Sequence, residues 1–146
     1  MFRNLARRQL LAGAGAMALA SLLPTTRAAV PEGVVRIGQV VPLSGPLAAT
    51  TAPIVAGQTA LIDDTNARGG IHGNRIELVT LDDAFDPQKT VALTHQLIDD
   101  YNVCALFGYG TSAGVAAMLP TLAQRQMPLL ALYSGADMLR GHPQVF

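Results

Sequence analysis

The chain has 146 residues, of which 50% are hydrophobic and 14% charged, and its formal net charge at pH 7 is zero. This composition excludes a disordered, charge-rich segment and is typical of a compact domain with an apolar core. The single cysteine excludes a disulfide bond within the chain.

The charges are unevenly distributed along the chain. Arg3, Arg7, Arg8 and Arg27 lie in the first 28 residues, which contain no acid, so the remainder carries an excess of negative charge. Domains that bind nucleic acid present basic surfaces. The distribution of charge therefore argues against DNA or RNA as a partner.

Residues 1–28 have the organisation of a secretory signal peptide. After the first basic residues, an uncharged apolar stretch covers 10–23, and Pro24 follows it. Thr26-Arg27-Ala28 provides small residues at the positions that define a cleavage site. The apolar stretch is too short to cross a hydrocarbon core of ~30 Å at ~1.5 Å per residue. We therefore expect export to the periplasm, with membrane contact only during export.

The paired Arg7-Arg8 resembles the start of a twin-arginine export signal. Two alternatives are an ordinary Sec signal that happens to contain two arginines, and an uncleaved membrane anchor. In each case we exclude residues 1–28 from the analysis of the fold.

Beyond the signal, segments typical of strands and helices alternate. Runs of β-branched and apolar residues predict strands at 34–41, 76–81, 103–107 and 128–132, with a fifth beginning at 145–146. Helical periodicity and capping residues predict helices over 53–66, from Asp86-Pro87 onward, after Thr111 or Ser112, and as a short turn over 136–140. This alternation predicts an α/β fold, a three-layer sandwich around a parallel sheet with strand order 2-1-3-4-5.

Two side-chain placements follow from this scheme. The first helix is expected to turn Ile54, Leu61 and Ile62 toward the core, and Cys104, within a strand, is expected to be a buried and inert thiol. Asp82-Asp83, which follows the second strand, is expected to be a solvated pair of carboxylates.

A ligand site is expected beyond the carboxyl ends of the strands, where the strand order reverses between the first and third strands. Two loops rich in glycine and hydroxyl groups should meet there, 42–51 and 108–112. Thr111 and Ser112 precede a helix, whose free N–H groups favour a carboxylate. Asp137, in the loop after the fourth strand, is a candidate partner for a ligand ammonium group.

A purely local interpretation competes with each of these assignments. Thr111 or Ser112 would then only cap its helix, Asp137 would cap the following turn, and Ser44 would stabilise its own Ser-Gly-Pro turn.

The order and spacing of several motifs resemble the leucine-binding family of type I periplasmic binding proteins, the receptors of amino-acid ABC importers. The motifs, spread over 34–146, are Ile37-Gly38, Pro42-Leu43-Ser44-Gly45-Pro46, the segment 66–73, Ile76-Glu77-Leu78 with Asp82-Asp83, Pro87, and the segment 108–112. The resemblance implies that residues 29–146 form part of an N-terminal lobe, that a membrane permease is the partner, and that no cofactor is needed.

The resemblance also assigns roles to individual residues. It implies that Thr111 and Ser112, with Gly110 in their loop, hold the ligand carboxylate, and that Ser134 and Asp137 help to hold its amino group. Another ligand contact aligns near Thr50. Family members commonly have glycine where Thr51 stands and leucine receptors have an aromatic ring near Thr50, so leucine itself is in doubt. Because one lobe does not enclose a ligand, we expect this chain to bind weakly or not at all.

Other functions have weaker support in the sequence. The segment 108–114 resembles a dinucleotide-binding loop, but its spacing is GxGxxxG and the acid expected after the next strand is absent. A ligand-sensing lobe of a receptor is a further alternative. The three histidines are far apart in sequence, which argues against a zinc site, and we find no catalytic constellation.

Overall fold

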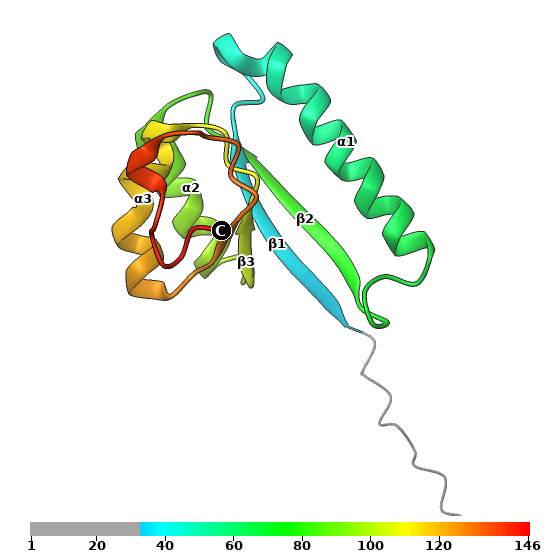
Figure 1. Ribbon diagram of the computed structural model, residues 1–146. Coiled ribbons are helices and arrows are strands. Elements are labelled where there is room, and N and C mark those ends of the chain that lie inside the picture. Colours follow the sequence, from blue (N-terminus) through cyan, green and yellow to red (C-terminus); the bar gives the residue numbers. More distant parts are fainter. Residues whose placement is uncertain (1–32) are drawn as a thin grey trace, which may run out of the picture.

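The computed structural model describes residues 33–146, so the predicted signal peptide lies outside the described residues. Four parallel strands form one sheet in the order β2-β1-β3-β4 (Figure 1). The strands are β1 (Val34–Val41), β2 (Arg75–Asp82), β3 (Ala105–Phe107) and β4 (Leu129–Leu130). Val145 makes a parallel bridge with Leu129, which places the last residues beside β4. The predicted order is confirmed, with the fifth strand present as this single bridge.

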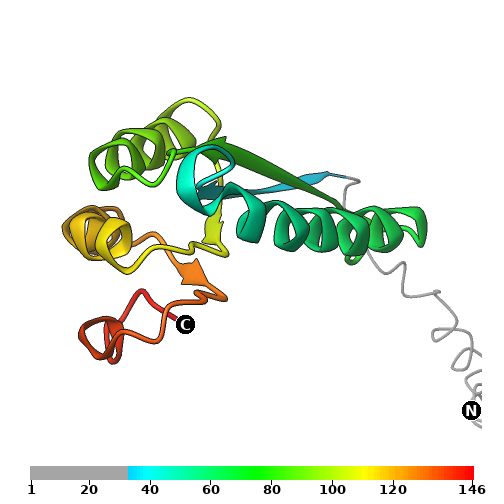
Figure 2. The same ribbon diagram turned by 90° about the horizontal axis from the view of Figure 1, so that it is seen from above.

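Helices cover both faces of the sheet, as the three-layer prediction requires (Figure 2). One face carries α1 (Ala48–Ala67), and the other carries α2 (Pro87–Asp99) and α3 (Ser112–Arg125). Two short 3-10 helices complete the fold, η1 (Gly45–Leu47) and η2 (Asp137–Leu139). Among the described helices, none has the length and hydropathy that crossing a membrane requires.

The start of α1 differs from the sequence-based expectation. The helix begins at Ala48 rather than at Pro53, and Pro53 lies inside it. The preceding 3-10 turn contains Pro46 at its first positions and leads directly into α1. Pro46 therefore provides the preset φ angle from which the helix grows. The start of α2 is as predicted, because Asp86 accepts hydrogen bonds from the amides of Gln88 at 2.8 Å and Lys89 at 3.4 Å.

The hydrophobic core lies between the sheet and the α2–α3 layer. Its fully buried side chains come from both layers and include Leu97, Leu106, Val115, Met118, Leu122 and Leu129. Gly38 of β1 lets α2 approach closely, because a β-carbon at this position would lie 2.9 Å from Cδ1 of Leu97. This layer therefore fixes the strands whose carboxyl ends form the candidate site.

The layer between the sheet and α1 is more polar than expected. Leu61 is 65% exposed and Ile54 is 38% exposed, so their predicted core positions are wrong, whereas Ile62 is half-buried. A side-chain hydrogen bond instead joins this helix to β1, from Nε2 of Gln39 to Oε1 of Gln58 at 2.9 Å. Gln58 thus contacts β1, whereas Ile54 and Leu61 lie at the surface of the helix.

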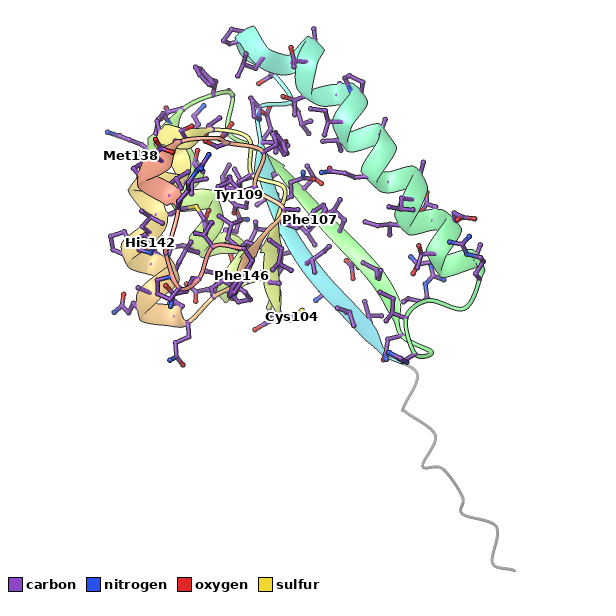
Figure 3. The ribbon with its side chains drawn as sticks, viewed as in Figure 1. Cys104, Phe107, Tyr109, Met138, His142 and Phe146 are labelled. Carbon is purple, nitrogen blue, oxygen red and sulfur yellow. The ribbon has the colours of Figure 1, made fainter. Side chains whose placement is uncertain are left out.

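Cys104 is exposed, not buried as predicted. It precedes β3, which begins only at Ala105, and lies at the end of the sheet opposite Tyr109 (Figure 3). β3 starts two residues later than predicted but ends at Phe107 as predicted. β4 ends early, at Leu130, where Ala131 follows with a positive φ of 52°.

Candidate functional site

The candidate site lies at the carboxyl edge of the sheet. The loops that contain Ser44 and Thr111 follow β1 and β3, which are neighbouring parallel strands. Both loops consequently leave the sheet at the same edge, where ligands bind in folds of this type. The loop after β4 emerges beside them, because β4 pairs with β3 in parallel.

Two serine hydroxyls join the loops after β3 and β4. Ser112 Oγ and Ser134 Oγ form a hydrogen bond, and Ser134 Oγ also accepts one from the amide of Ala136 at 3.3 Å. The backbone adds a second link, since the amide of Tyr133 donates to the carbonyl of Tyr109 at 3.3 Å. Both serines are only half-buried, so a small solute has access to this pair.

Sequence reasoning missed Tyr133 as part of this site. Its ring covers the glycines of the neighbouring loop, and a β-carbon at Gly110 would lie 2.5 Å from Cε2 of Tyr133. Burial raises the pKa of the Tyr133 hydroxyl, so it remains protonated at neutral pH. An aromatic residue directly after a predicted strand, at the edge expected to bind ligand, was the available signal.

Thr111 turns its side chain inward rather than toward solvent. It is 9% exposed and precedes α3, but its hydroxyl makes no capping hydrogen bond. A β-carbon at Gly114 would lie 2.6 Å from Oγ1 of Thr111 and 2.7 Å from Oγ1 of Thr90. These two hydroxyls thus flank Gly114 between α2 and α3. A role for the Thr111 hydroxyl in ligand binding remains a prediction.

The other predicted residues lie at the same edge but are exposed. Ser44 follows β1, and Thr50 lies in the first turn of α1. Asp137 lies in η2, and its carboxylate forms an ion pair with Nε of Arg140 at 3.2 Å. None of these three makes a hydrogen bond to the Ser112–Ser134 pair among the contacts of residues 33–146. Their contact with a ligand remains a prediction.

Asp82 and Asp83 do not form the solvated pair that was predicted. Asp83 is fully buried, because consecutive residues at the end of a strand point to opposite faces of the sheet. Asp82 is exposed, and its Oδ1 accepts hydrogen bonds from the amides of Leu43 at 2.8 Å, Ala84 at 2.9 Å and Ser44 at 3.1 Å. The carboxylate of Asp82 therefore holds the Ser-Gly-Pro turn in place.

These hydrogen bonds change the acidity of Asp82. Partial burial alone would raise the pKa of this carboxyl, but hydrogen bonding by Ser44 and by the amides of Ala84 and Leu43 outweighs it and lowers the pKa from 3.8 to about 2. A lowered pKa in the folded state stabilises the fold above pH 3.8, and this contribution is lost as the pH falls through about 2.

We expect Asp82→Asn to lower the free energy of unfolding by about 1 kcal/mol near pH 6, after allowance for solvent screening. The difference from the wild type should shrink toward zero near pH 2, where Asp82 itself becomes protonated. Urea unfolding at several pH values measures it, with Asp63→Asn on the exposed surface of α1 as the control. A difference in the free energy of unfolding between wild type and Asp82→Asn that stays unchanged at low pH would contradict the role assigned to the carboxylate.

Within residues 33–146, His, Cys, Asp and Glu side chains form no group of three that is able to hold a metal ion. What the edge offers is a pair of hydroxyls, an aromatic ring and the beginning of α3. The free N–H groups and partial positive charge of a helix N-terminus favour a carboxylate. The fold and this edge define an α/β domain with a candidate site for a small polar solute.

The family model for periplasmic binding proteins matches residues 34–146, and the chain belongs to this family. A curated relative, the Leu/Ile/Val-binding protein of Escherichia coli strain K12, is 33% identical over 97 residues, which cover 66% of this chain and 24% of the relative.

Two solved structures have the same fold. A substrate-binding periplasmic protein from Ralstonia solanacearum is 32% identical with a TM-score of 0.73, covering 77% of this chain and 32% of that protein. A branched-chain amino acid transporter substrate-binding protein from Streptococcus pneumoniae, solved in complex with isoleucine, is 28% identical with a TM-score of 0.69, covering 77% of this chain and 33% of that one. The chain thus spans a quarter to a third of the length of these proteins.

Proposed function

We propose that the chain provides one lobe of an extracytoplasmic solute-binding subunit of an ABC importer. Its ligand is a small amino acid or carboxylate, bound non-covalently and delivered to a membrane permease. The observation that carries this proposal is the pair of half-buried hydroxyls, Ser112 and Ser134, joined between two loops at the carboxyl edge of the sheet.

The chemistry of this edge supports a carboxylate-bearing ligand. Serine hydroxyls are neutral donors, and Ser112 is also the first residue of α3, where backbone N–H groups have no partner within the helix. Together these groups suit a carboxylate without the need for a cationic side chain. The exposed carboxylate of Asp137 is available for an ammonium group, once a ligand displaces Arg140. Relatives named for binding amino acids agree with this ligand class.

A single lobe covers only one side of a ligand, whereas binding sites normally bury most of the ligand surface. We therefore expect the 146-residue chain to bind leucine, isoleucine, valine or acetate with dissociation constants above about 1 mM. Saturation-transfer NMR detects binding in this range, and at least one of these ligands should give a signal. Micromolar affinity in calorimetry would contradict a one-lobe site.

The serine pair is tested by the double variant Ser112→Ala/Ser134→Ala. Loss of both hydroxyls should weaken binding about tenfold and remove the NMR signal. Thr59→Ala, an exposed hydroxyl on α1, is the matched control and should leave the signal unchanged. If the double variant binds as well as the control, the role proposed for the serine pair is wrong.

Export is part of the same proposal, because an importer subunit acts outside the cytoplasm. The support is the basic, apolar and small-residue pattern of residues 1–28, including Arg7-Arg8. Fusion of residues 1–30 to a reporter should direct it to the periplasm, and Arg7→Lys/Arg8→Lys should block this transfer. Transfer that survives the double substitution would contradict the twin-arginine route.

A further inference from the structure

A chain of buried hydrogen bonds runs beneath the candidate site. Asp83, Thr90, Thr94 and Tyr109 are each 0% exposed. The hydroxyl of Thr90 donates to Oδ2 of Asp83 at 2.6 Å, and the hydroxyl of Thr94 donates to the carbonyl of Thr90 at 2.7 Å. Tyr109 completes the chain, with its hydroxyl 2.9 Å from Oγ1 of Thr94.

The direction of these hydrogen bonds is fixed by the donors that are available. Thr94 has one hydroxyl proton, and the carbonyl of Thr90 at 2.7 Å is a stronger acceptor for it than the sulfur of Met118 at 3.5 Å, so the hydroxyl of Tyr109 is the donor to Thr94. Burial, and to a smaller extent the charge of Asp83, raises the pKa of Tyr109, while its hydrogen bond with Thr94 opposes this. Tyr109 is thus protonated at physiological pH and able to donate.

This hydrogen-bond network does more than fill space in the core. Buried polar groups are unfavourable unless they are hydrogen-bonded, and a phenylalanine would fill most of the space of Tyr109 without a hydroxyl. A network in which every buried polar group is hydrogen-bonded fixes the arrangement of its side chains more strictly than close packing alone. Tyr109 lies between the sheet and the α2–α3 layer (Figure 3). Its hydroxyl is hydrogen-bonded to Thr94 on α2, and its backbone belongs to the loop after β3.

The backbone of Tyr109 connects this anchor to both loops of the site. Its carbonyl accepts the hydrogen bond from the amide of Tyr133, at the start of the loop that contains Ser134. Thr90, another residue of this hydrogen-bond network, also packs against Gly114 in the first turn of α3, near Ser112. Both hydroxyls of the Ser112–Ser134 pair are therefore within a few residues of groups held by the same buried network.

We propose that Tyr109 is a positioning residue, which holds the loops after β3 and β4 together through its hydrogen bond to Thr94 on α2. This inference rests on the proposed function, because it assigns a purpose to the geometry of the solute-binding edge. Tyr109 itself touches no solute, since its side chain is buried.

The test uses the 146-residue chain and needs no ligand. Amide hydrogen exchange is followed by NMR at Tyr133, whose amide donates to Tyr109, and at Leu106 in β3, which reports on global opening. In Tyr109→Phe and in Thr94→Val, the exchange rate of Tyr133 relative to that of Leu106 should rise about tenfold, the equivalent of one lost hydrogen bond. Thr94→Ser keeps the hydroxyl and should restore the wild-type ratio.

Thr121→Val is the matched control. Its hydroxyl also joins α3 to α2, at 3.3 Å from Nε2 of His95, and this hydrogen bond does not involve the loops after β3 and β4. If Tyr109 only stabilised the fold as a whole, the two test substitutions would raise the exchange rates of Tyr133 and Leu106 equally. The ratio of the two rates would then stay unchanged, and this result would overturn the proposal. Exchange is measured without solute, so an unchanged exchange ratio would contradict only the role of Tyr109 and not the solute-binding proposal. Conversely, a lack of solute binding would not alter the exchange result.

Discussion

Replacing Leu97 with alanine is expected to lower the free energy of unfolding by about 3 kcal/mol. Leu97 is fully buried in the layer between the sheet and α2, where its Cδ1 atom packs against Gly38 of β1. Truncation removes buried apolar surface and leaves a cavity that the surrounding strands fill only in part. A domain of this size has a total stability of about 5–15 kcal/mol, so the loss is a large share of it.

Urea unfolding followed by circular dichroism measures this loss. Leu61→Ala is the matched control, since the same truncation on α1 affects a side chain that is 65% exposed. We expect the control to change stability by less than about 0.5 kcal/mol. Equal losses in the two variants would mean that the principal core does not lie between the sheet and α2.

The second large effect is expected at Gly70, in the turn that connects α1 to β2. Gly70 has a φ angle of 71°, and a β-carbon at this position would overlap the carbonyl oxygen of Asn74. The overlap arises because the chain folds back on itself here, with the amide of Ile71 donating to the same oxygen at 2.8 Å. Gly70→Ala should therefore lower the free energy of unfolding by about 3 kcal/mol, from backbone strain and steric overlap together.

Gly69→Ala separates these two contributions. Gly69 also has a positive φ angle, 99°, but no atom lies within 4 Å of the position of a β-carbon. This variant should lose only the conformational contribution, about 1 kcal/mol. Thermal unfolding of both variants gives the comparison. If Gly69→Ala is destabilised as strongly as Gly70→Ala, then the close approach of Asn74 to Gly70 contributes nothing to the loss in free energy of unfolding.

The parts of the fold that the sequence predicted correctly depend on local signals. β1 is rich in β-branched residues, and Asp86-Pro87 provides the cap and first residue of α2, so both elements are found where expected. The strand order follows from the alternation of strands and helices and from the handedness of their connections. The start of α1 was missed because Pro46 and Pro53 carry the same local signal. Pro46 lies in the 3-10 turn that leads into the helix at Ala48, whereas Pro53 lies inside the helix.

The candidate site depends on contacts between distant residues, which local signals do not reveal. Ser112 and Ser134 are 22 residues apart in sequence, and only the pairing of β3 with β4 brings their hydroxyls together. The anchoring of Tyr109 on Thr94 likewise requires the packing of α2 beneath the loop. Periodicity shows that Ile54 and Leu61 share one side of a helix, but not whether a neighbour covers that side.

The most direct test of the solute-binding account is a titration of the isotope-labelled chain with leucine, isoleucine, valine and acetate, followed by amide chemical shifts. The account predicts that the largest shifts cluster in the loops after β1, β3 and β4, including Gly110, Ser112 and Ser134. Shifts that cluster instead at the opposite end of the sheet, around Cys104 and the turn at Ile71–Asn74, would contradict it.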